Sequence, residues 1–528
     1  MKTMRKSVSF MLASLVVLVT ILAACSGGNN EGTTGGESDP NVKKDPITVS
    51  MYDRGNVPPE VGTVDNNLWT QWINETVPVE YVPVPRWESV QRFNTLLAAG
   101  DAPDLILEYD NAYRNQLYLQ KQLMPIEELI EQHSVEYKAL LEEFPLLRQL
   151  GTKSDGQLYE FGRLLGYIPG GYLFIREDLL EAAGLEVPQT VEEAYEAMKK
   201  VKADQLATFG TNMSGYNWMD VAFQNTTWVL EDGDMVKDWE RVAAATQYKK
   251  QLFDEGLIDR DFMTDKNGEK ALQDFVQGNT FMFGFAGNAL LVYNNYETLK
   301  SNVPDAKLAV IPLPRSEFGQ FSPYFNDPVQ MTGVVNIKAE DPESVMRYVD
   351  LMSSDSMAHT LKYGQEGVHY EMVDGVEQTL DQDKYEKEVS WLGDYRMLGG
   401  QHIINEFTKY LEDLDQSDPF DKEVHTLLET AFNLYIDRER PLPEVTKYMP
   451  GLPDDIQFVV SNVNEPMSDL WSRAIVGGSN ATVDKTLEEA KTLWSRSDGE
   501  QVEQFYLEWY RENKDTWVFT EDLYDMNF

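Results

Sequence analysis

Cysteine is nearly absent from this chain: Cys25 is the only one in 528 residues. A chain with one thiol has no internal disulfide, so its stability must come from a buried core. A metal site built from several thiolates is excluded for the same reason. The sequence after Cys25 contains no thiol at all, which also excludes cysteine nucleophile chemistry in the folded part.

Positive charge is scarce as well. Lys and Arg number 45 against 88 Asp and Glu, a formal net charge of −43. So acidic a surface repels nucleic acid and anionic membranes, and we expect no nucleic-acid partner. Beyond the first 24 residues, no apolar run approaches the roughly 18 residues that a membrane-spanning helix requires. The chain is therefore not a permease.

Enzyme signatures are missing too. The five histidines are scattered, and neither a Gly-x-Ser-x-Gly elbow nor a His-Glu-x-x-His helix occurs. The segment "ADQLATFGTN" (203–212) has a single carboxylate, Asp204, whereas calcium needs about six to eight oxygen ligands. We expect no metal, no cofactor and no enzymatic activity.

The first 24 residues have the pattern of a signal peptide. Lys2, Arg5 and Lys6 precede an uncharged apolar run from Val8 to Ala24. The sequence Leu22-Ala23-Ala24-Cys25 resembles the lipobox of bacterial lipoproteins, which implies that Cys25 is diacylated and becomes the first residue. Two acyl chains anchor a protein stably. The alternative is a secreted protein with a chance cysteine at its cleavage site.

Residues 25–45 form the predicted lipidated cysteine and tether. They are rich in Gly, Ser, Asn and Thr, a composition that cannot bury enough apolar surface to fold. We expect a flexible spacer. The predicted location is the cell membrane, with the protein lipid-anchored and facing the extracellular side.

The rest of the chain alternates strand-like and helix-like segments, which predicts an α/β fold. Its length is enough for two or more lobes. Strands are predicted at 47–52, 104–109, 280–287, 307–314 and 333–337. Helices are predicted at 87–100, with Trp87 and Phe93 on its buried face, and over 175–184, 190–202, 341–352 and 482–496.

Several segments, in order, resemble the extracellular solute-binding lipoproteins of bacterial ABC importers, of the maltose-binding type. They are "LLAAGDAPDLILEYD" (96–110), "FIREDLLEAAGLEVPQTVEEAYEAMKKVK" (174–202), "LFDEGLIDRDF" (252–262) and "DFVQGNTFMFGFAG" (274–287). "KYGQEGVHYEMVDG" (362–375) points to a branch of long lipoproteins that includes alginate-oligosaccharide binders.

The resemblance implies a two-lobed periplasmic-binding-protein type II fold with a ligand cleft between the lobes. The predicted N-terminal lobe is 46–165 plus about 326–400, and the C-terminal lobe is 166–325 plus about 401–528. The implied function is capture of an extracellular solute, for which we expect an oligosaccharide, and its delivery to the permease subunits of an ABC importer.

Candidate ligand-binding residues follow the predicted strands or lie in loops that contain aromatic residues. In open α/β sheets, ligands bind at strand ends. Aromatic rings suit the faces of a sugar, and polar side chains pair with its hydroxyls. Trp391 is singled out because no helical or strand periodicity around it demands a core residue. The candidates are Asp53, Arg54, Asn56, Tyr109, Asp110, Asn111, Tyr216, Trp218, Phe285, Asn288, Tyr324, Asp327, Trp391 and Arg396.

The charge of the sugar stays open at this stage. A uronic-acid sugar would need arginine in the cleft, for which Arg54, Arg86, Arg163 and Arg396 are candidates. The acidic total charge mildly favours a neutral sugar, but the field inside a pocket is local. Two other functions remain open: a secreted carbohydrate hydrolase, which would need two carboxylates flanking a cleft, and a surface glycan sensor not coupled to transport.

Overall fold

The structure, a computed structural model, describes residues 45–373, 375–402, 406–445, 447–449 and 452–526. The predicted signal peptide, Cys25 and the tether up to residue 44 lie outside the described residues. Residues 46–528 form one compact unit. In the described part of the chain, no helix is both long and apolar enough to cross a membrane.

The first of two central sheets has five strands in the order β4-β1-β5-β15-β6. Strand β1 pairs in parallel with β4 and β5, whereas β15 is antiparallel to β5 and β6. The strands predicted at 47–52, 104–109 and 333–337 are confirmed. The bounds are β1 Ile47–Asp53, β4 Val79–Pro85, β5 Leu105–Leu107, β6 Glu160–Leu164 and β15 Val329–Val335.

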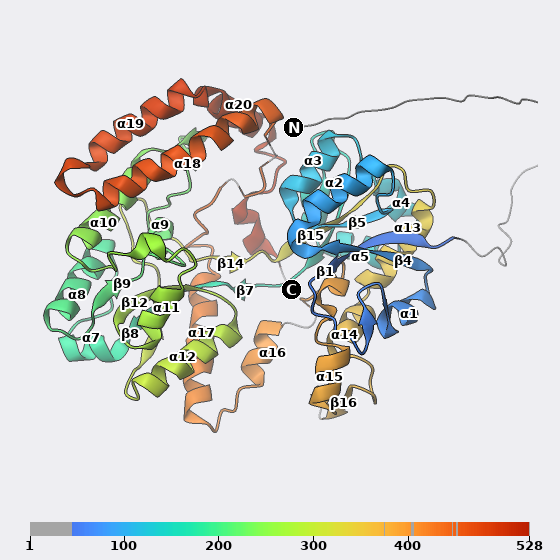
Figure 1. Ribbon diagram of the computed structural model, residues 1–528, viewed down its shortest axis with the longest axis horizontal. Coiled ribbons are helices and arrows are strands. Elements are labelled where there is room, and N and C mark those ends of the chain that lie inside the picture. Colours follow the sequence, from blue (N-terminus) through green and yellow to red (C-terminus); the bar gives the residue numbers. More distant parts are fainter. Residues whose placement is uncertain (1–44, 374, 403–405, 446, 450–451, 527–528) are drawn as a thin grey trace, which may run out of the picture. The chain divides into compact units, whose positions relative to one another are not determined.

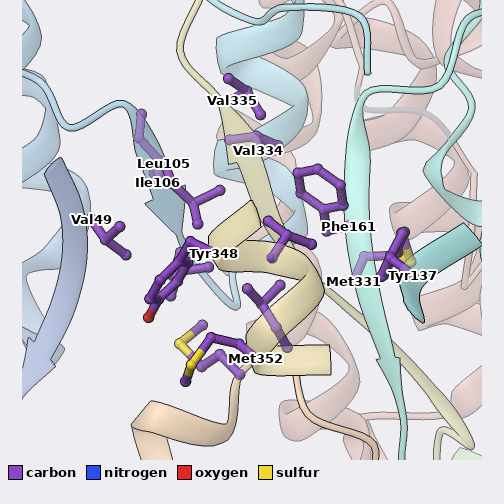
Figure 2. Close-up of a cluster of buried hydrophobic side chains, with 14 of the residues drawn as sticks. Val49, Leu105, Ile106, Tyr137, Phe161, Met331, Val334, Val335, Tyr348 and Met352 are labelled. Carbon is purple, nitrogen blue, oxygen red and sulfur yellow. The ribbon is translucent and has the colours of Figure 1, made fainter. Parts of the chain in front are cut away.

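A continuous apolar core covers this sheet (Figure 2). Val49, Ile106 and Phe161 come from three of its strands and are fully buried. Tyr348 comes from α13 (Pro342–Ser353), and its side chain points at the strands in Figure 2. The helix begins where the sequence predicts, because the Asp341 side chain accepts a hydrogen bond from the third residue of the helix.

Other helices of this part of the chain surround the first sheet. Their bounds are α1 Leu68–Asn74, α2 Ser89–Ala99, α3 Asn111–Leu119, α4 Glu127–His133, α5 Glu136–Glu143, α6 Pro145–Gly151, α14 Asp355–Tyr363 and α15 Gln382–Glu388. Two short hairpins, β2–β3 (Gly62–Thr63 and Asn66–Asn67) and β16–β17 (Tyr370–Val373 and Val376–Thr379), and the 3₁₀ helix η3 (Leu392–Arg396) complete it.

The second sheet has four strands in the order β13-β8-β12-β9. Helix α8 (Val191–Ala203), which matches the helix predicted at 190–202, packs against it with Val191, Ala194, Met198 and Val201 buried. Thr190 caps α8, because its side chain accepts from the backbone N–H of Glu193. The bounds are β8 Gly171–Arg176, β9 Phe209–Thr211, β12 Thr280–Ala286 and β13 Leu308–Val310.

The remaining helices extend this second part. Three of them, α18, α19 and α20, pack together (Figure 1). Helix α20 also contacts β11 of the hairpin β10–β11. The bounds are α7 Glu177–Ala183, α9 Trp218–Ala222, β10 Trp228–Glu231, β11 Asp234–Lys237, α10 Glu240–Asp254, α11 Glu269–Val276, α12 Ala289–Asn302, α16 Glu406–Glu412, α17 Pro419–Tyr435, α18 Asp454–Val476, α19 Val483–Arg496 and α20 Gly499–Asn513.

Two connections between the sheets run side by side. The chain leaves β6 through β7 (Ile168–Pro169) to reach β8, and returns from β13 through β14 (Phe325–Asn326) to β15. Strands β7 and β14 pair with each other in antiparallel fashion. Residues on these crossings are therefore held next to both sheets.

One helix prediction is wrong at its start. Helix α2 begins at Ser89, and Trp87 lies in the preceding 3₁₀ turn, Arg86–Glu88. Phe93 is fully buried as predicted, but Trp87 is 83% exposed because the turn directs it away from the helix face. The helix ends at Gly100, whose φ of +83° suits glycine.

Candidate ligand-binding pocket

A pocket of about 920 Å³ is lined by residues that come from around both sheets. One wall comes from β6, α3 and α6, and another from α12, the β14 crossing and the C-terminal segments. Small-molecule sites in proteins typically occupy about 300–1,000 Å³, so the pocket is large enough for more than one sugar residue.

Five of the predicted site residues line this pocket. Tyr109 follows β5, and Asn111 is the first residue of α3. Asn288 caps α12 by accepting a hydrogen bond from the N–H of Leu291, and its side chain is exposed. Tyr324 and Asp327 flank the crossing strand β14. The structure therefore brings predicted residues from three separate segments of the chain together at one pocket.

Tyr109 is held in place from three sides. Its ring stacks on Tyr52 with centroids 5.5 Å apart, and the guanidinium of Arg163 lies 5.7 Å from its centroid. Its hydroxyl donates to Oδ1 of Asp394 at 3.2 Å. Burial raises the pKa of Tyr109, so the hydroxyl stays protonated and can donate at neutral pH. The ring offers a fixed aromatic surface to the pocket.

The other predicted loop residues are not in the pocket lining. Asp53 is the exposed last residue of β1, and Arg54 and Asn56 lie in the exposed loop that follows it. Arg54 forms an ion pair with Asp394. The Asp110 carboxylate caps α3 by accepting from the N–H groups of Ala112 and Tyr113.

Two predicted tryptophans are core residues. Trp391 is 8% exposed, meets Tyr395 edge-on and donates from Nε1 to the carbonyl of Lys387. The premise that nothing around Trp391 demands a core residue is wrong, because η3 packs under the first sheet. Trp218 is fully buried and donates to Oγ1 of Thr211 at 2.9 Å.

The remaining predicted residues support the lining rather than form it. The Tyr216 hydroxyl accepts a hydrogen bond from the N–H of Tyr324. Phe285 is half-buried and packs among the aromatic side chains of the second sheet. Arg396 contacts Glu406, which is itself a lining residue, at 3.2 Å.

Cationic groups outnumber anionic groups in the lining. The lining carboxylate of Glu406 is shared between the lining cation Lys362, at 2.8 Å, and Arg396, which is not itself a lining residue, at 3.2 Å. Glu160 lies behind the wall, is fully buried, and is likewise shared between Arg114 at 2.9 Å and Lys153. The lining contains five cations, Arg114, Lys153, Arg163, Lys362 and Lys447, and two carboxylates, Asp327 and Glu406.

Arg163 has neutral partners only among its hydrogen bonds. Its Nε and Nη2 donate to Oε1 of Gln330 at 3.1 and 2.8 Å, and its Nη1 donates to the carbonyl of Arg396. Burial lowers the pKa of Arg163, but arginine keeps its charge in proteins. This guanidinium therefore places a positive charge at the pocket wall that no carboxylate engages by a hydrogen bond, although Asp394 and Glu406 act on it electrostatically.

At the opposite wall, Asp327 and Lys447 form an ion pair. Burial raises the pKa of Asp327, although the Lys447 ammonium acts in the opposite direction. Aromatic surface is provided nearby by Tyr324, which is 44% exposed, and by Trp509 and Trp517, whose centroids are 5.0 Å apart. Within the described residues, no group of three or more His, Cys, Asp or Glu side chains could hold a metal ion.

The sequence did not reveal most of these lining residues. Lys153, Lys362 and Lys447 stand in segments without a recognisable motif, and their role appears only when distant elements come together. Arg163 was one of four arginines considered for a carboxylate. Its place within β6, a buried strand, was the available signal.

Comparisons with known proteins show the family and the fold of this chain. The model of the family described as bacterial extracellular solute-binding protein matches residues 67–358, over half of the chain. The fructooligosaccharide ABC transporter substrate-binding protein FusA of Streptococcus pneumoniae serotype 4 is 23% identical over 299 residues, 49% of this chain and 53% of FusA. This chain thus aligns with about half the length of FusA.

Two further relatives match over nearly the whole chain. The polygalacturonan/rhamnogalacturonan-binding protein YtcQ of Bacillus subtilis is 22% identical over 540 residues, 95% of this chain and 98% of YtcQ. The solved structure of alginate-binding protein AlgQ2 without calcium ion has a TM-score of 0.60 and 19% identity, covering 92% of this chain and 99% of AlgQ2. This likeness confirms the predicted α/β fold of the periplasmic-binding-protein type.

Proposed function

We propose that this chain, which belongs to the bacterial extracellular solute-binding protein family, captures an acidic oligosaccharide outside the cell and delivers it to the permease of an ABC importer. The observation that carries the choice of ligand is the excess of positive charge in the pocket lining, five cations against two carboxylates. The chain as a whole has a net charge of −43, so this local excess runs against the global composition.

The charge argument depends on how the carboxylates are shared. Glu160 and Glu406 each contact two cations, so each cluster keeps one positive charge. Arg163 adds a third, because its acceptors are an amide and a carbonyl. An arginine can bind a carboxylate with two parallel hydrogen bonds, and such bonds are stronger in a pocket that excludes water.

The aromatic part of the lining suits sugar rings. Tyr109, Tyr324 and Trp509 offer flat apolar surface, and Asn111 and Asn288 offer amides that pair with hydroxyls. Sugar-binding relatives are consistent with this reading, since YtcQ is described as binding polygalacturonan and AlgQ2 as binding alginate.

Measuring the reversible binding of acidic and neutral oligosaccharides tests this proposal directly. Residues 46–528 form one compact unit, so this part can be tested as a soluble protein. We expect oligogalacturonides or alginate oligomers at about 100 times their dissociation constant to raise the unfolding free energy by about 2.7 kcal/mol. Kestose and maltotriose serve as neutral comparisons. A melting temperature that rises only with the neutral sugars would overturn the acidic assignment.

Recovery of the ligand separates a receptor from a hydrolase. After long incubation with the protein, the bound oligosaccharide should elute from a sizing column at its original length. Release of shorter sugars with new reducing ends would favour the enzyme.

The proposed anchor is the acylated Cys25. In cells that produce the full chain, we expect wild-type protein in the membrane fraction and the Cys25→Ser variant in the medium or soluble fraction. Ser26→Ala is the matched control and should stay with the membrane. Membrane retention of Cys25→Ser would argue against lipidation at this residue.

A further inference from the structure

Trp87 is the most exposed large apolar side chain among the described residues, at 83%. It stands in the 3₁₀ turn between β4 and α2. Because β4 and β5 both run parallel to β1, this turn lies at the same end of the first sheet as the carboxyl end of β5. Covering an exposed indole face with an apolar surface is favourable, because it removes apolar area from water. The face of Trp87 is therefore available to a flat apolar partner.

Arg86, its neighbour, lies among three aromatic rings. The carbon of its guanidinium is 4.7 Å from the centroid of Tyr52, 5.3 Å from Tyr109 and 5.3 Å from Trp87. Its Nε is buried and lacks an acceptor. In the described part of the chain, no carboxylate forms an ion pair with this guanidinium. A cation held between rings, with donors unused, is set to bind the oxygens of a ligand.

A surface hollow of about 880 Å³ lies alongside these two residues. Polar groups that suit sugar hydroxyls complete it, notably the amides of Gln91 and Asn94 and the carboxylates of Glu88 and Asp110. The Asn94 oxygen accepts from the Tyr113 hydroxyl, which leaves its amide N–H groups to donate to a ligand.

This hollow adjoins the large pocket through one short segment. Tyr109 lines the pocket, and the next residue, Asp110, lines the hollow. The Arg86 guanidinium lies 5.3 Å from both Tyr109 and Trp87, so a single side chain separates the pocket's aromatic wall from the exposed indole. An oligosaccharide seated in the pocket could extend over this guanidinium.

We propose that Arg86 and Trp87 form an outer subsite that binds a further sugar residue of the captured oligosaccharide. The apolar face of that sugar lies on the indole, and its oxygens accept hydrogen bonds from the Arg86 guanidinium. This inference rests on the proposed function and adds to it: affinity increases with the length of the oligosaccharide until the outer subsite is filled.

Calorimetric titration of residues 46–528 with oligogalacturonides from the dimer to the hexamer tests the subsite, with neutral oligomers from kestose upward in parallel. Wild type, Trp87→Ala and Arg86→Gln are compared with Phe458→Ala, a control that removes another exposed aromatic, 67% exposed on α18. For the longest oligomers we expect Trp87→Ala to weaken binding about tenfold, which is about 1.4 kcal/mol. The shortest oligomers should bind all variants equally.

Trp87→Phe keeps an aromatic face and should recover most of the lost affinity. Because Trp87 is exposed, the melting temperatures of the two Trp87 variants should match that of wild type, which separates loss of binding from misfolding. Equal affinity of wild type and Trp87→Ala at every length would overturn the subsite and leave the proposed function standing. An equal loss at every length would place Trp87 in the primary site and overturn the subsite as well. Absence of binding of any oligomer to wild type would overturn both proposals.

Discussion

Arg54 and Asp394, distant in sequence, form an ion pair with two hydrogen bonds: Nε lies 2.5 Å from Oδ2, and Nη2 lies 3.0 Å from Oδ1. Arg54 follows β1, whereas Asp394 belongs to η3. The same carboxylate accepts from the hydroxyl of Tyr109, a residue of the pocket lining. The pair thus connects the loop after the first strand to the aromatic wall of the pocket.

Removing this carboxylate should cost stability and alter the pocket wall. We predict that Asp394→Asn lowers the unfolding free energy by about 1–2 kcal/mol, because hydrogen bonds to a charged group are lost at a partly exposed position. In a double-mutant cycle with Arg54→Gln, the two losses should not add. Urea unfolding measures all three variants. Strict additivity would show that the pair contributes nothing to stability.

Glu160 should matter more, because it is fully buried between two cations. Its carboxylate accepts from Nε of Arg114 at 2.9 Å and from Nζ of Lys153. Burial favours the neutral form of Glu160, but the two cations outweigh it and lower the pKa. Glu160→Gln leaves two buried cations without an anion, and we predict a loss of about 3–5 kcal/mol in unfolding free energy.

The matched control for this change is Glu131→Gln. Glu131 also pairs with a lysine, Lys138, but the Glu131 side chain is exposed and that of Lys138 is partly exposed. Its replacement should leave the unfolding free energy nearly unchanged. Similar losses of unfolding free energy for Glu160→Gln and Glu131→Gln would mean that burial of the carboxylate does not set the size of the loss.

Local sequence patterns predicted most of the fold. The helix predicted at 190–202 is α8, Val191–Ala203, whose apolar residues are spaced so that they share one buried face. The ordered segments between 96 and 375 indicated the family, which the match over residues 67–358 confirms. These features depend on neighbouring residues, whose effects are visible in one stretch of chain.

The pocket was less predictable because its residues come from separate elements. Tyr109 and Tyr324 were found through their places after a strand and near a crossing. The burial of Trp391 could not be predicted, because the burial of an irregular segment depends on what packs against it, here the core of the first sheet. The exposure of Trp87 could not be predicted either, since helical spacing could not reveal that the helix begins two residues later.

Acid should weaken a contact between the β16–β17 hairpin and α16. Partial burial raises the pKa of Glu377, but hydrogen bonds with Lys409 and His359 outweigh it, and the pKa falls to about 2. Because the folded state holds this proton less tightly than the unfolded state, the contribution is complete above the unfolded pKa of about 4.3. It is lost as the pH falls from there toward 2.

We therefore predict that wild type and Glu377→Gln differ most in unfolding free energy near pH 6 and converge as the pH falls through 4 toward 3. Glu371→Gln, an exposed residue on the paired strand, is the control and should show no such convergence. Urea unfolding at each pH measures the difference. A gap that stays constant with pH would contradict the assignment of the effect to this carboxylate.

Arg163 should discriminate between acidic and neutral sugars. It is 7% exposed, its hydrogen-bond acceptors are neutral, and it places a positive charge at the pocket wall. Arg163→Gln removes the charge, and we predict that oligogalacturonide binding weakens by roughly tenfold, since a charge-assisted pair is lost. Neutral oligomers should lose much less, and the salt dependence of acidic binding should become shallower. Arg148→Gln, at a partly exposed arginine paired with Glu127, is the control. Equal losses for both sugars would show that Arg163 supports the wall by packing and does not select for charge.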